Sequence, residues 1–312
     1  MTPKILVITG PTATGKTKLG IELAKKLGGE VISADSMQIY KGMDIGTAKP
    51  TKQEMDGVLH HLISTVDPSE SYSAARFVSE ASAIADDILR RAKLPVLVGG
   101  TGLYIDSLVS ARDFMGENEM LRFELSERYD NEGSEKMFSL LSEHDPESAA
   151  KLHPNDKKRI IRALEVFYLT GKKISDHNIE TQQRACRYDT CKIALNYADR
   201  KTLYEKIDQR VDRMIEKGLK YEVKALLASG VDRKSTAMQA IGYKEMAMAL
   251  NGVITFEKAV ELIKTRSRRY AKRQLSWLNR KEDVHWIIWE NEPDYLKAFQ
   301  KSTTFVKDYG II

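Results

Sequence analysis

Residues 10–17 read GPTATGKT: Gly10, Pro11, Thr12, Ala13, Thr14, Gly15, Lys16 and Thr17. They follow the apolar run Ile5–Ile8 and precede a segment in which leucine recurs every four residues, at positions 19, 23 and 27. A GxxxxGK[ST] loop between a strand and a helix is a P-loop, whose backbone N–H groups and helix N-terminus together face an anion. A tight glycine turn with an exposed lysine is the alternative. The sequence therefore predicts a polyphosphate site and leaves open whether ATP is the ligand.

Two side chains of this loop have expected roles in the chemistry. Lys16 would reach the outer phosphates of the ligand. The Thr17 hydroxyl would hold a magnesium ion, so we expect Mg²⁺ as the cofactor.

The composition is ordinary for a soluble globular protein, with 312 residues, 42% hydrophobic and 30% charged. The net charge of +5 favours an anionic partner. Residues 1–4 lead directly into the first strand without a signal-peptide pattern, and no apolar run approaches the roughly 20 residues that span a bilayer. We therefore expect a cytoplasmic protein with no membrane contact. The absence of a heptad pattern or an apolar stripe suggests a monomer.

The two cysteines, Cys186 and Cys191, are spaced C-x4-C. No second pair completes a zinc site, and the spacing differs from a redox C-x-x-C motif. We expect two reduced thiols.

The first 112 residues alternate between strand-like and helix-like segments. The predicted strands are residues 5–8, 31–33, 62–66 and 96–98, and the predicted helices are 16–27, 74–92 and 103–108. This alternation predicts an α/β fold of the P-loop NTPase-like class, a parallel sheet flanked by helices. Ligands of such a sheet bind beyond the carboxyl ends of the strands.

Polar residues follow the second predicted strand. Asp35 is a candidate general base or a carboxylate that supports the metal, and the alternative is a turn or cap aspartate. Gln38 and Tyr40 could contact a second substrate. Residues 42–50 read as a loop mobile enough to close over a site. His60–His61 read as a buried, hydrogen-bonded pair, with metal ligation as the alternative.

The strand at 96–98 ends in Gly99-Gly100-Thr101-Gly102, without the acidic residue that supports the metal in an ATPase. This counts against ordinary ATP hydrolysis. Thr101 could bind a phosphate or a substrate group, or serve only as a helix N-cap.

The middle of the chain loses its strand-like runs. We predict an all-helical insertion domain over residues 113–187, with the α/β core in two parts, 1–112 and 188–312. The predicted helices of the insertion are 119–129, 134–142, 147–152, 155–169 and 175–183. Residues 157–164 carry a basic face beside an apolar stripe, which is either a solvated surface or a contact with RNA.

The sequence after the insertion predicts a strand at 192–196 and a final strand at 284–289. Between them it predicts helices at 201–217, 220–228, 237–250 and 256–279. Arg210 and Arg213 lie on one helix face. The strongest basic cluster, interleaved with Tyr270 and Trp277, is a plausible nucleic-acid surface; its members are Lys264, Arg266, Arg268, Arg269, Lys272 and Arg273.

Taken together, these motifs resemble those of one family, the bacterial tRNA dimethylallyltransferases, also called isopentenyl-tRNA transferases. The most specific match is SADSMQIY at residues 33–40, followed by DIGTAKP at 44–50. Further matches are the P-loop and residues 60–62, 99–104, 159–164, 239–244 and 270–274, with Trp277. The zinc finger of the eukaryotic relatives is absent, as expected for a bacterial form.

The resemblance implies a prenyl transfer. The dimethylallyl group of dimethylallyl diphosphate would move to N6 of the adenine 3′-adjacent to the anticodon, tRNA position 37, giving N6-dimethylallyladenosine and diphosphate. The P-loop would bind the donor's diphosphate with magnesium, and no ATP would be hydrolysed. The expected partners are dimethylallyl diphosphate and the anticodon stem-loop of tRNA, whose loop the insertion would bind.

The resemblance also implies residue roles. The catalytic candidates are Asp35, Lys16, Thr17, Thr101 and Arg210: Asp35 takes a proton from the N6 amine, and Lys16 and Arg210 stabilise the departing diphosphate. Arg122 is the best match to a tRNA-contacting arginine of the family. The other expected tRNA contacts are Asp35, Ser36, Met37, Gln38, Thr101, Arg159, Ile160, Ile161, Arg162, Ala163, Gln239, Ala240, Ile241, Gly242, Tyr243 and Lys244, to which the basic cluster adds Lys272 and Arg273.

Three alternatives stay open. A small-molecule kinase would bind ATP on the P-loop and a hydroxylated acceptor near Asp35. An adenylate isopentenyltransferase would use a free nucleotide as acceptor, although the helical insertion and basic clusters favour a large RNA. A non-enzymatic RNA-binding module would show no turnover with any polyphosphate donor.

Overall fold

The computed structural model describes residues 2–110, 112 and 114–311. It divides into two compact units, one formed by Met1–Val109 with Arg187–Ile312 and the other by Ser110–Cys186. The sequence predicts the insertion at 113–187, and its expected first residue, Asp113, lies outside the described residues. In the part of the chain that the structure describes, no helix combines the length and the apolar character needed to cross a membrane.

The larger unit is built on a six-stranded sheet with the order β3-β2-β4-β1-β5-β6. Every neighbouring pair is parallel. The strands are β1 (Lys4–Thr9), β2 (Glu30–Ala34), β3 (His60–His61), β4 (Pro95–Gly99), β5 (Asp189–Tyr197) and β6 (Val284–Trp289). The predicted α/β class with a parallel sheet is confirmed. The carboxyl ends of all six strands lie along one edge, where the P-loop begins.

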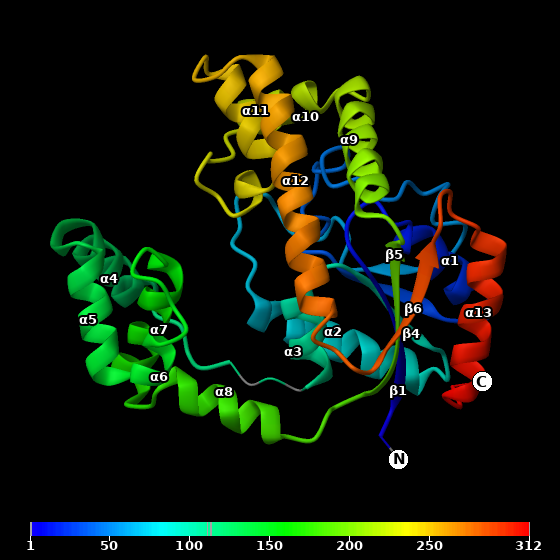
Figure 1. Cartoon of the computed structure of the whole chain (residues 1–312), viewed down its shortest axis with the longest axis horizontal. Helices are drawn as coiled ribbons and strands as arrows, with labels where there is room; N and C mark the ends of the chain where they lie inside the picture. The colour runs from blue at the N-terminus through cyan, green and yellow to red at the C-terminus, as the bar shows by residue number, and fades with distance from the viewer. Residues whose placement is uncertain (1, 111, 113, 312) are drawn as a thin grey trace. The chain divides into compact units, whose positions relative to one another are not determined.

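Both faces of the sheet are covered by helices. Ile5 and Val7 of β1 belong to the cluster that includes α2 and α3, whereas Leu6 and Ile8 belong to the cluster that includes α1 and α13. The covering helices are α1 (Lys16–Lys26), α2 (Ala74–Arg90), α3 (Gly102–Val109) and α13 (Tyr295–Asp308). Figure 1 shows α1 and α13 together on one side of the sheet and α2 and α3 on the other. Strands buried on both faces are continuous apolar runs, as residues 5–8 are.

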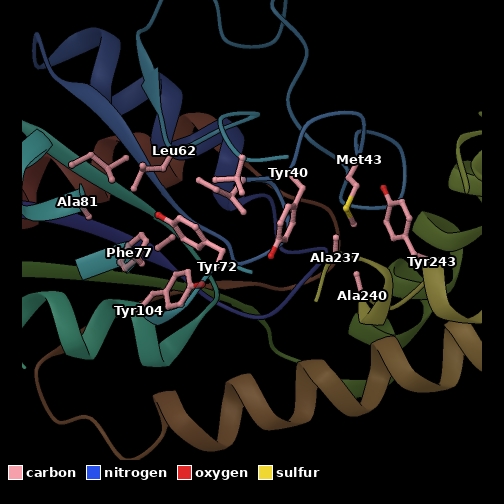
Figure 2. Packing of buried hydrophobic residues seen from close by; sticks show 14 of the residues in the cluster. Tyr40, Met43, Leu62, Tyr72, Phe77, Ala81, Tyr104, Ala237, Ala240 and Tyr243 are labelled. Carbon is pink, nitrogen blue, oxygen red and sulfur yellow. The ribbon is translucent and has the colours of Figure 1, made fainter. Parts of the chain in front are cut away.

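A layer of helices continues the core of this unit beyond the strand ends. Its members are α9 (Arg200–Glu216), α10 (Leu219–Ala228), the 3₁₀ turn η1 (Ala237–Gln239), α11 (Tyr243–Leu250) and α12 (Phe256–Leu278). In Figure 2, Tyr40 and Met43 from the segment after β2 lie near Ala237, Ala240 and Tyr243 of this layer. All five side chains are buried in one hydrophobic cluster with the sheet. The helical layer is therefore fixed to the edge of the sheet at which ligands are expected.

Two predicted elements are wrong. The strand predicted at 62–66 is a loop, because Leu62 and Ser64 have positive φ angles of 58° and 52°, and only β3 precedes it. The helix predicted at 237–250 is interrupted, because Ala240 has an extended backbone and α11 begins only after Gly242. Both breaks occur beside the candidate site, where packing against neighbouring elements overrides local propensity.

The histidine pair forms β3 and is hydrogen-bonded as expected, although it is only partly buried. His61 Nε2 lies 2.9 Å from Oε2 of Glu30 in the neighbouring strand. His60 Nδ1 donates to the carbonyl of Val58 at 2.8 Å. Arg91 and Lys93 also donate to Glu30, and their hydrogen bonds hold the pKa of that buried carboxyl far below its usual range. The pair is part of a structural ion cluster.

The smaller unit is all-helical, as predicted. Its helices are α4 (Glu119–Glu132), α5 (Ser134–His144), α6 (Pro146–Ala149), α7 (Lys157–Thr170) and α8 (Ile174–Gln183). Leu125, Met137, Leu141 and Leu164 are buried in a hydrophobic core that belongs to this unit alone. Asp145 caps α6 by accepting a hydrogen bond from the N–H of Ser148. The unit has the capped helices and separate core of an independently packed domain.

Cys186 is exposed, Cys191 is buried, and both are free thiols. Burial raises the pKa of the Cys191 thiol to about 11, so that it stays protonated at neutral pH.

Candidate active site

The P-loop joins β1 to α1 and is held in shape by the neighbouring strands. Gly10 has a φ of 136°, and a Cβ atom there would lie 2.4 Å from the carbonyl oxygen of Leu195 in β5. Thr14 Oγ1 donates to the carbonyl of Pro11 at 2.8 Å, and Trp289 Nε1 of β6 donates to the carbonyl of Thr14 at 3.0 Å. The loop is thus preformed at the N-terminus of α1, where an anion binds.

Positive charge is concentrated beside this loop. Lys16 Nζ donates to the carbonyl of Pro11 at 2.8 Å. Burial lowers the pKa of Lys16 to about 7, the charge of Arg210 lowers it as well, and Asp35 acts in the opposite direction. Burial also lowers the pKa of Arg210, and Asp35 again opposes the shift. A diphosphate bound here would compensate two cations whose charges are otherwise costly to bury.

A pocket, which we call the inner pocket, opens beside Lys16 and Thr17. One part of its lining is therefore suited to phosphate. Another part is apolar and consists of Ile21, Val31, Ile63 and Val98. The inner pocket combines the surfaces needed for a ligand with a charged and an apolar end.

A second pocket, the outer pocket, lies against the helical layer. Its own lining includes Ser36, Met37, Gln239, Ala240, Ile241 and Arg273. Four residues line both pockets: Thr12, Asp35, Arg210 and Tyr270. These four residues form the junction of the two pockets.

The position of Asp35 is compatible with both roles considered for it from the sequence. Its Oδ1 atom accepts hydrogen bonds from the N–H groups of Met37 at 2.9 Å and Gln38 at 3.3 Å, which is the geometry of a turn aspartate. Among the described residues, none donates a hydrogen bond to Oδ2. One oxygen therefore shapes the turn, and the other is available at the junction of the two pockets.

Thr101 lies behind this junction. It precedes α3, and its Oγ1 atom accepts a hydrogen bond from the N–H of Ser36 at 3.2 Å. Its hydroxyl also interacts with the side chain of Tyr270 in α12 and lowers the pKa of that phenol. Thr101 lines neither pocket, so in this conformation it supports the Asp35 turn and Tyr270.

The sequence placed Tyr270 in a nucleic-acid surface and gave Gln274 no role beyond its place in a motif; neither was expected at the junction of the pockets. Gln274 accepts a hydrogen bond from the N–H of Thr12 at 2.9 Å and donates to the carbonyl of Gly100 at 2.9 Å, which joins the P-loop to the loop after β4. Burial raises the pKa of Tyr270 to about 12, and the charge of Asp35 adds to the shift. The i, i+4 spacing of the two polar side chains on α12 was the available signal.

The donor set fits a magnesium ion that is shared with a phosphate ligand. Thr17 and Asp35 line the inner pocket together with Lys16. Within residues 2–110, 112 and 114–311, no group of three or more His, Cys, Asp or Glu side chains could hold a metal. Mg²⁺ commonly takes few protein ligands and completes its shell with substrate phosphates and water. The Thr17 hydroxyl suits that arrangement.

The basic cluster on α12 is partly neutralised. Ion pairs join Lys264 to Asp212, Arg266 to Glu245 and Arg268 to Asp208. Arg269, Lys272 and Arg273 are exposed, and within the described part of the chain none of them has an acidic partner within salt-bridge distance. The cationic surface of this helix is therefore narrower than the sequence suggested, and Arg273 carries it to the outer pocket.

The expected tRNA contacts of the insertion differ in exposure. Ile160, Ile161 and Ala163 are buried in the core of that unit, so their side chains cannot reach RNA in this conformation. The Arg159 side chain is 71% exposed and is paired with Asp156. The two remaining arginines share one acceptor: Arg122 and Arg162 both donate to the buried Glu165 carboxylate.

The segment 239–244 also divides in two. Gln239, Ala240 and Ile241 line the outer pocket, and Lys244 is exposed. Tyr243 is fully buried, and its hydroxyl donates to Glu222 of α10 at 2.5 Å. Tyr243 therefore supports the site from behind and does not present its ring to a ligand.

Comparison with family models gives two matches. The model described as IPP transferase matches residues 38–281, and the model described as Isopentenyl transferase matches residues 3–65. The first alone covers more than half of the chain and includes the Asp35 turn from Gln38 onward, the insertion and α12.

Similar curated proteins are named tRNA dimethylallyltransferase. The protein from Caldanaerobacter subterraneus is 48% identical over 299 residues, which cover 95% of each chain. The protein from Bacillus subtilis is 48% identical over 285 residues, which cover 91% of this chain and 90% of the relative.

Solved structures agree with these matches. The full-length tRNA isopentenylpyrophosphate transferase from Bacillus halodurans has a TM-score of 0.72 at 41% identity and aligns over 99% of this chain and 98% of its own. A eukaryotic dimethylallyltransferase acting on tRNA has a TM-score of 0.83 at 34% identity, over 98% of this chain and 80% of its own. Motifs, sheet topology and comparisons agree, and the chain belongs to the tRNA dimethylallyltransferase (IPP transferase) family.

Proposed function

We propose that this protein transfers the dimethylallyl group of dimethylallyl diphosphate to N6 of the adenine 3′-adjacent to the anticodon of tRNA, position 37. The products are N6-dimethylallyladenosine and diphosphate. The observation that carries the proposal is the junction of two pockets at Thr12, Asp35, Arg210 and Tyr270; the P-loop lines one pocket, and the exposed cation Arg273 of α12 lines the other.

The inner pocket is the proposed donor site. Its P-loop side offers backbone N–H groups, Lys16 and Arg210 to a diphosphate, and its apolar side suits a short alkenyl chain. The strand that precedes Thr101 ends in glycines without a carboxylate, which supports a use of the P-loop other than ATP hydrolysis. Magnesium held by Thr17 would further neutralise the charge of the diphosphate.

The outer pocket is the proposed acceptor site. An adenine stacked in an anticodon loop must leave its stack before its N6 amine can be modified. The exposed cation Arg273 lines this pocket, and Arg269 and Lys272 on the same helix are also exposed. Together they supply the positive surface that holds RNA phosphates.

The chemistry is a displacement at the allylic carbon. The N6–C1 bond forms while the bond from C1 to the diphosphate oxygen breaks, and the diphosphate leaves with the electron pair. Lys16 and Arg210 stabilise the charge that grows on it. Asp35 Oδ2, which accepts no hydrogen bond from another described residue, takes the proton from N6. The protein acts as a monomer in the cytoplasm, where its tRNA substrate is found.

A transfer assay tests the proposal. The protein is incubated with magnesium, labelled dimethylallyl diphosphate and an anticodon stem-loop that has adenine 3′ of the anticodon. We expect label on N6 of that adenine. Transfer to free AMP in place of the stem-loop would identify an adenylate isopentenyltransferase, and γ-phosphate transfer from ATP to an acceptor, without prenyl transfer, would identify a kinase.

A further inference from the structure

The loop Gly42–Pro50 forms walls of both pockets. Gly46 and Thr47 line the outer pocket, and Ala48 and Pro50 line the inner one. The sequence suggested a mobile lid here. In the structure this loop is fastened at several points, among them three backbone amides that a single carboxylate binds.

Glu222 of α10 binds three successive amides of this loop. Its Oε2 atom accepts from the N–H groups of Asp44 at 2.9 Å and Ile45 at 2.8 Å, and its Oε1 atom accepts from the N–H of Gly46 at 3.1 Å. Hydrogen bonds to a carboxylate are roughly twice as strong as those between neutral groups. One side chain thus fixes the path of three consecutive residues.

Tyr243 of α11 holds Glu222 in place. Its hydroxyl donates to Oε1 of Glu222 at 2.5 Å. Its ring lies so close to Gly46 that a Cβ atom at that position would be 2.4 Å from Cε2, which explains the glycine. Figure 2 shows Tyr243 beside Met43, the buried side chain of the same loop, with the hydroxyl oxygen directed toward the loop. The loop is therefore anchored from two helices.

The residue that follows the three bound amides makes contact with the active site. The Thr47 carbonyl accepts a hydrogen bond from Arg210 Nη2 at 3.2 Å and another from Gln38 Nε2 at 3.3 Å. Arg210 lines both pockets. The direction of the Thr47 carbonyl, and with it the place of the guanidinium, depends on the backbone that Glu222 fixes.

We propose that Glu222 is a positioning residue for the transfer: through residues 44–47 it directs Arg210 toward the departing diphosphate. The part of this inference that concerns catalysis rests on the proposed function. It assigns no substrate contact to Glu222, which acts through Arg210. A misplacement of about 1 Å at a reacting group can cost on the order of 100-fold in rate.

The main variant is Glu222→Gln, in which an amide NH₂ that cannot accept replaces one carboxylate oxygen. We expect kcat to fall about 10- to 100-fold and the Kd for the stem-loop to change less than about threefold. The matched control is Glu216→Gln, an exposed position at the end of α9, which should leave both values unchanged. A folded Glu222→Gln protein with kcat within twofold of the wild type would overturn the proposal.

A double-mutant cycle separates positioning from a purely structural role. If Glu222 acts through Arg210, Glu222→Gln should add less than about threefold to the loss caused by Arg210→Ala. Full additivity of the two losses would mean that Glu222 acts elsewhere. Tyr243→Phe, which removes one hydrogen bond to Glu222 and keeps the ring, should lower kcat about three- to tenfold, and it carries the test if Glu222→Gln does not fold.

Binding of inorganic pyrophosphate gives a readout that is independent of transfer. Glu222→Gln should weaken it by about tenfold, and Glu216→Gln should not. If the wild type fails to prenylate the stem-loop but this difference persists, the proposed function fails and the positioning role of Glu222 stands. Equal pyrophosphate affinities would refute the positioning role whatever the acceptor is.

Discussion

The two oxygens of Asp35 have different environments, and this makes its role testable. In Asp35→Asn the Oδ1 atom can still accept the turn hydrogen bonds from Met37 and Gln38, but the side chain cannot take a proton. We expect the single-turnover rate to fall at least about 100-fold while stem-loop binding persists, because a positioned base contributes about 10²–10⁴-fold.

The control for that measurement is Asp67→Asn. Asp67 is another turn aspartate, whose Oδ1 atom accepts from the N–H of Ser69 at 2.9 Å, and it is exposed. The Asp67→Asn variant should transfer the prenyl group at the wild-type rate. Near-normal turnover in Asp35→Asn would exclude Asp35 as the base.

The lowered pKa of Lys16 predicts a pH dependence of anion binding. In the free protein the ammonium is charged below about pH 7 and neutral above it. A bound diphosphate favours the charged form, so binding above pH 7 requires the uptake of a proton. The affinity for pyrophosphate should therefore fall as pH rises above about 7, by up to tenfold per unit.

Calorimetry in buffers of different ionisation enthalpy measures this proton uptake. Lys16→Arg is the control, since arginine stays charged over the whole range and so reports the titration of pyrophosphate itself. The wild type should take up about one proton more than the variant at pH 8. Equal uptake by the two proteins would show that Lys16 is already charged before the ligand binds.

The P-loop residues were predictable because their pattern is local, whereas Tyr270 and Gln274 were not. Thr12 and Gly100 are far from α12 in the sequence, and their hydrogen bonds to Gln274 exist only after the chain has folded. The burial of Tyr243 has the same cause, since its partner Glu222 comes from another helix. Local patterns identify residues that bind through backbone geometry and miss those that join distant segments.

Helix α12 presents two kinds of cation, and they should respond differently to salt. Lys272 is exposed without an acidic partner in the described part of the chain, whereas Lys264 is paired with Asp212. Lys272→Ala should weaken stem-loop binding and reduce the slope of log Kd against log salt by about 1. Lys264→Ala should change that slope by less than half as much.

Filter binding of the stem-loop at several salt concentrations makes the comparison. If Lys272→Ala binds as the wild type does at every concentration, this face of α12 is only solvated. Equal losses in the two variants would mean that the ion pair to Asp212 does not protect Lys264 from a role in binding.

Most elements were predictable from hydrophobic periodicity, and the failures have a physical pattern. The strands β1 and β4 contain buried apolar runs, β2 is buried along its whole length, and α1 carries leucines at helical spacing. The prediction of a strand at 62–66 was wrong because apolar periodicity does not indicate which residues have positive φ angles. The continuous helix predicted at 237–250 was wrong for a similar reason, since the backbone of Ala240 is extended where the residue packs beside the outer pocket.

The division into two compact units predicts that a substitution that destabilises one unit leaves the stability of the other unchanged. Leu141 is buried in the core of the insertion, whereas Met120 in α4 is 81% exposed. Leu141→Ala should destabilise the insertion by about 2–5 kcal/mol, and Met120→Ala by less than about 0.5 kcal/mol. Pyrophosphate affinity should be unchanged in both, since the P-loop belongs to the other unit.

Hydrogen exchange of the separate helices and pyrophosphate calorimetry together check this. Faster exchange in α4, α5 and α7 of Leu141→Ala, with unchanged exchange in α1, is the expected result. Loss of pyrophosphate binding in the same variant would mean that the two units fold as one cooperative block.

The insertion could be predicted because strand-like runs disappear from the sequence after residue 112, which marks the end of a sheet-forming segment. The order of the strands in the sheet could not be predicted from the sequence. Nothing local in residues 189–197 specifies that β5 pairs with β1 on one side and with β6 on the other. That pairing depends on long-range contacts that only the complete unit provides.

The position of β5 has a consequence for synthesis on the ribosome. Gly10 lies against Leu195, so the shape of the P-loop depends on a strand that emerges almost two hundred residues later. Between the two, the ribosome delivers the whole of Ser110–Cys186, a unit with its own core. The nascent chain therefore has time to complete the insertion while the P-loop is still unformed, and it gains the ability to hold diphosphate only after β5 has left the exit tunnel.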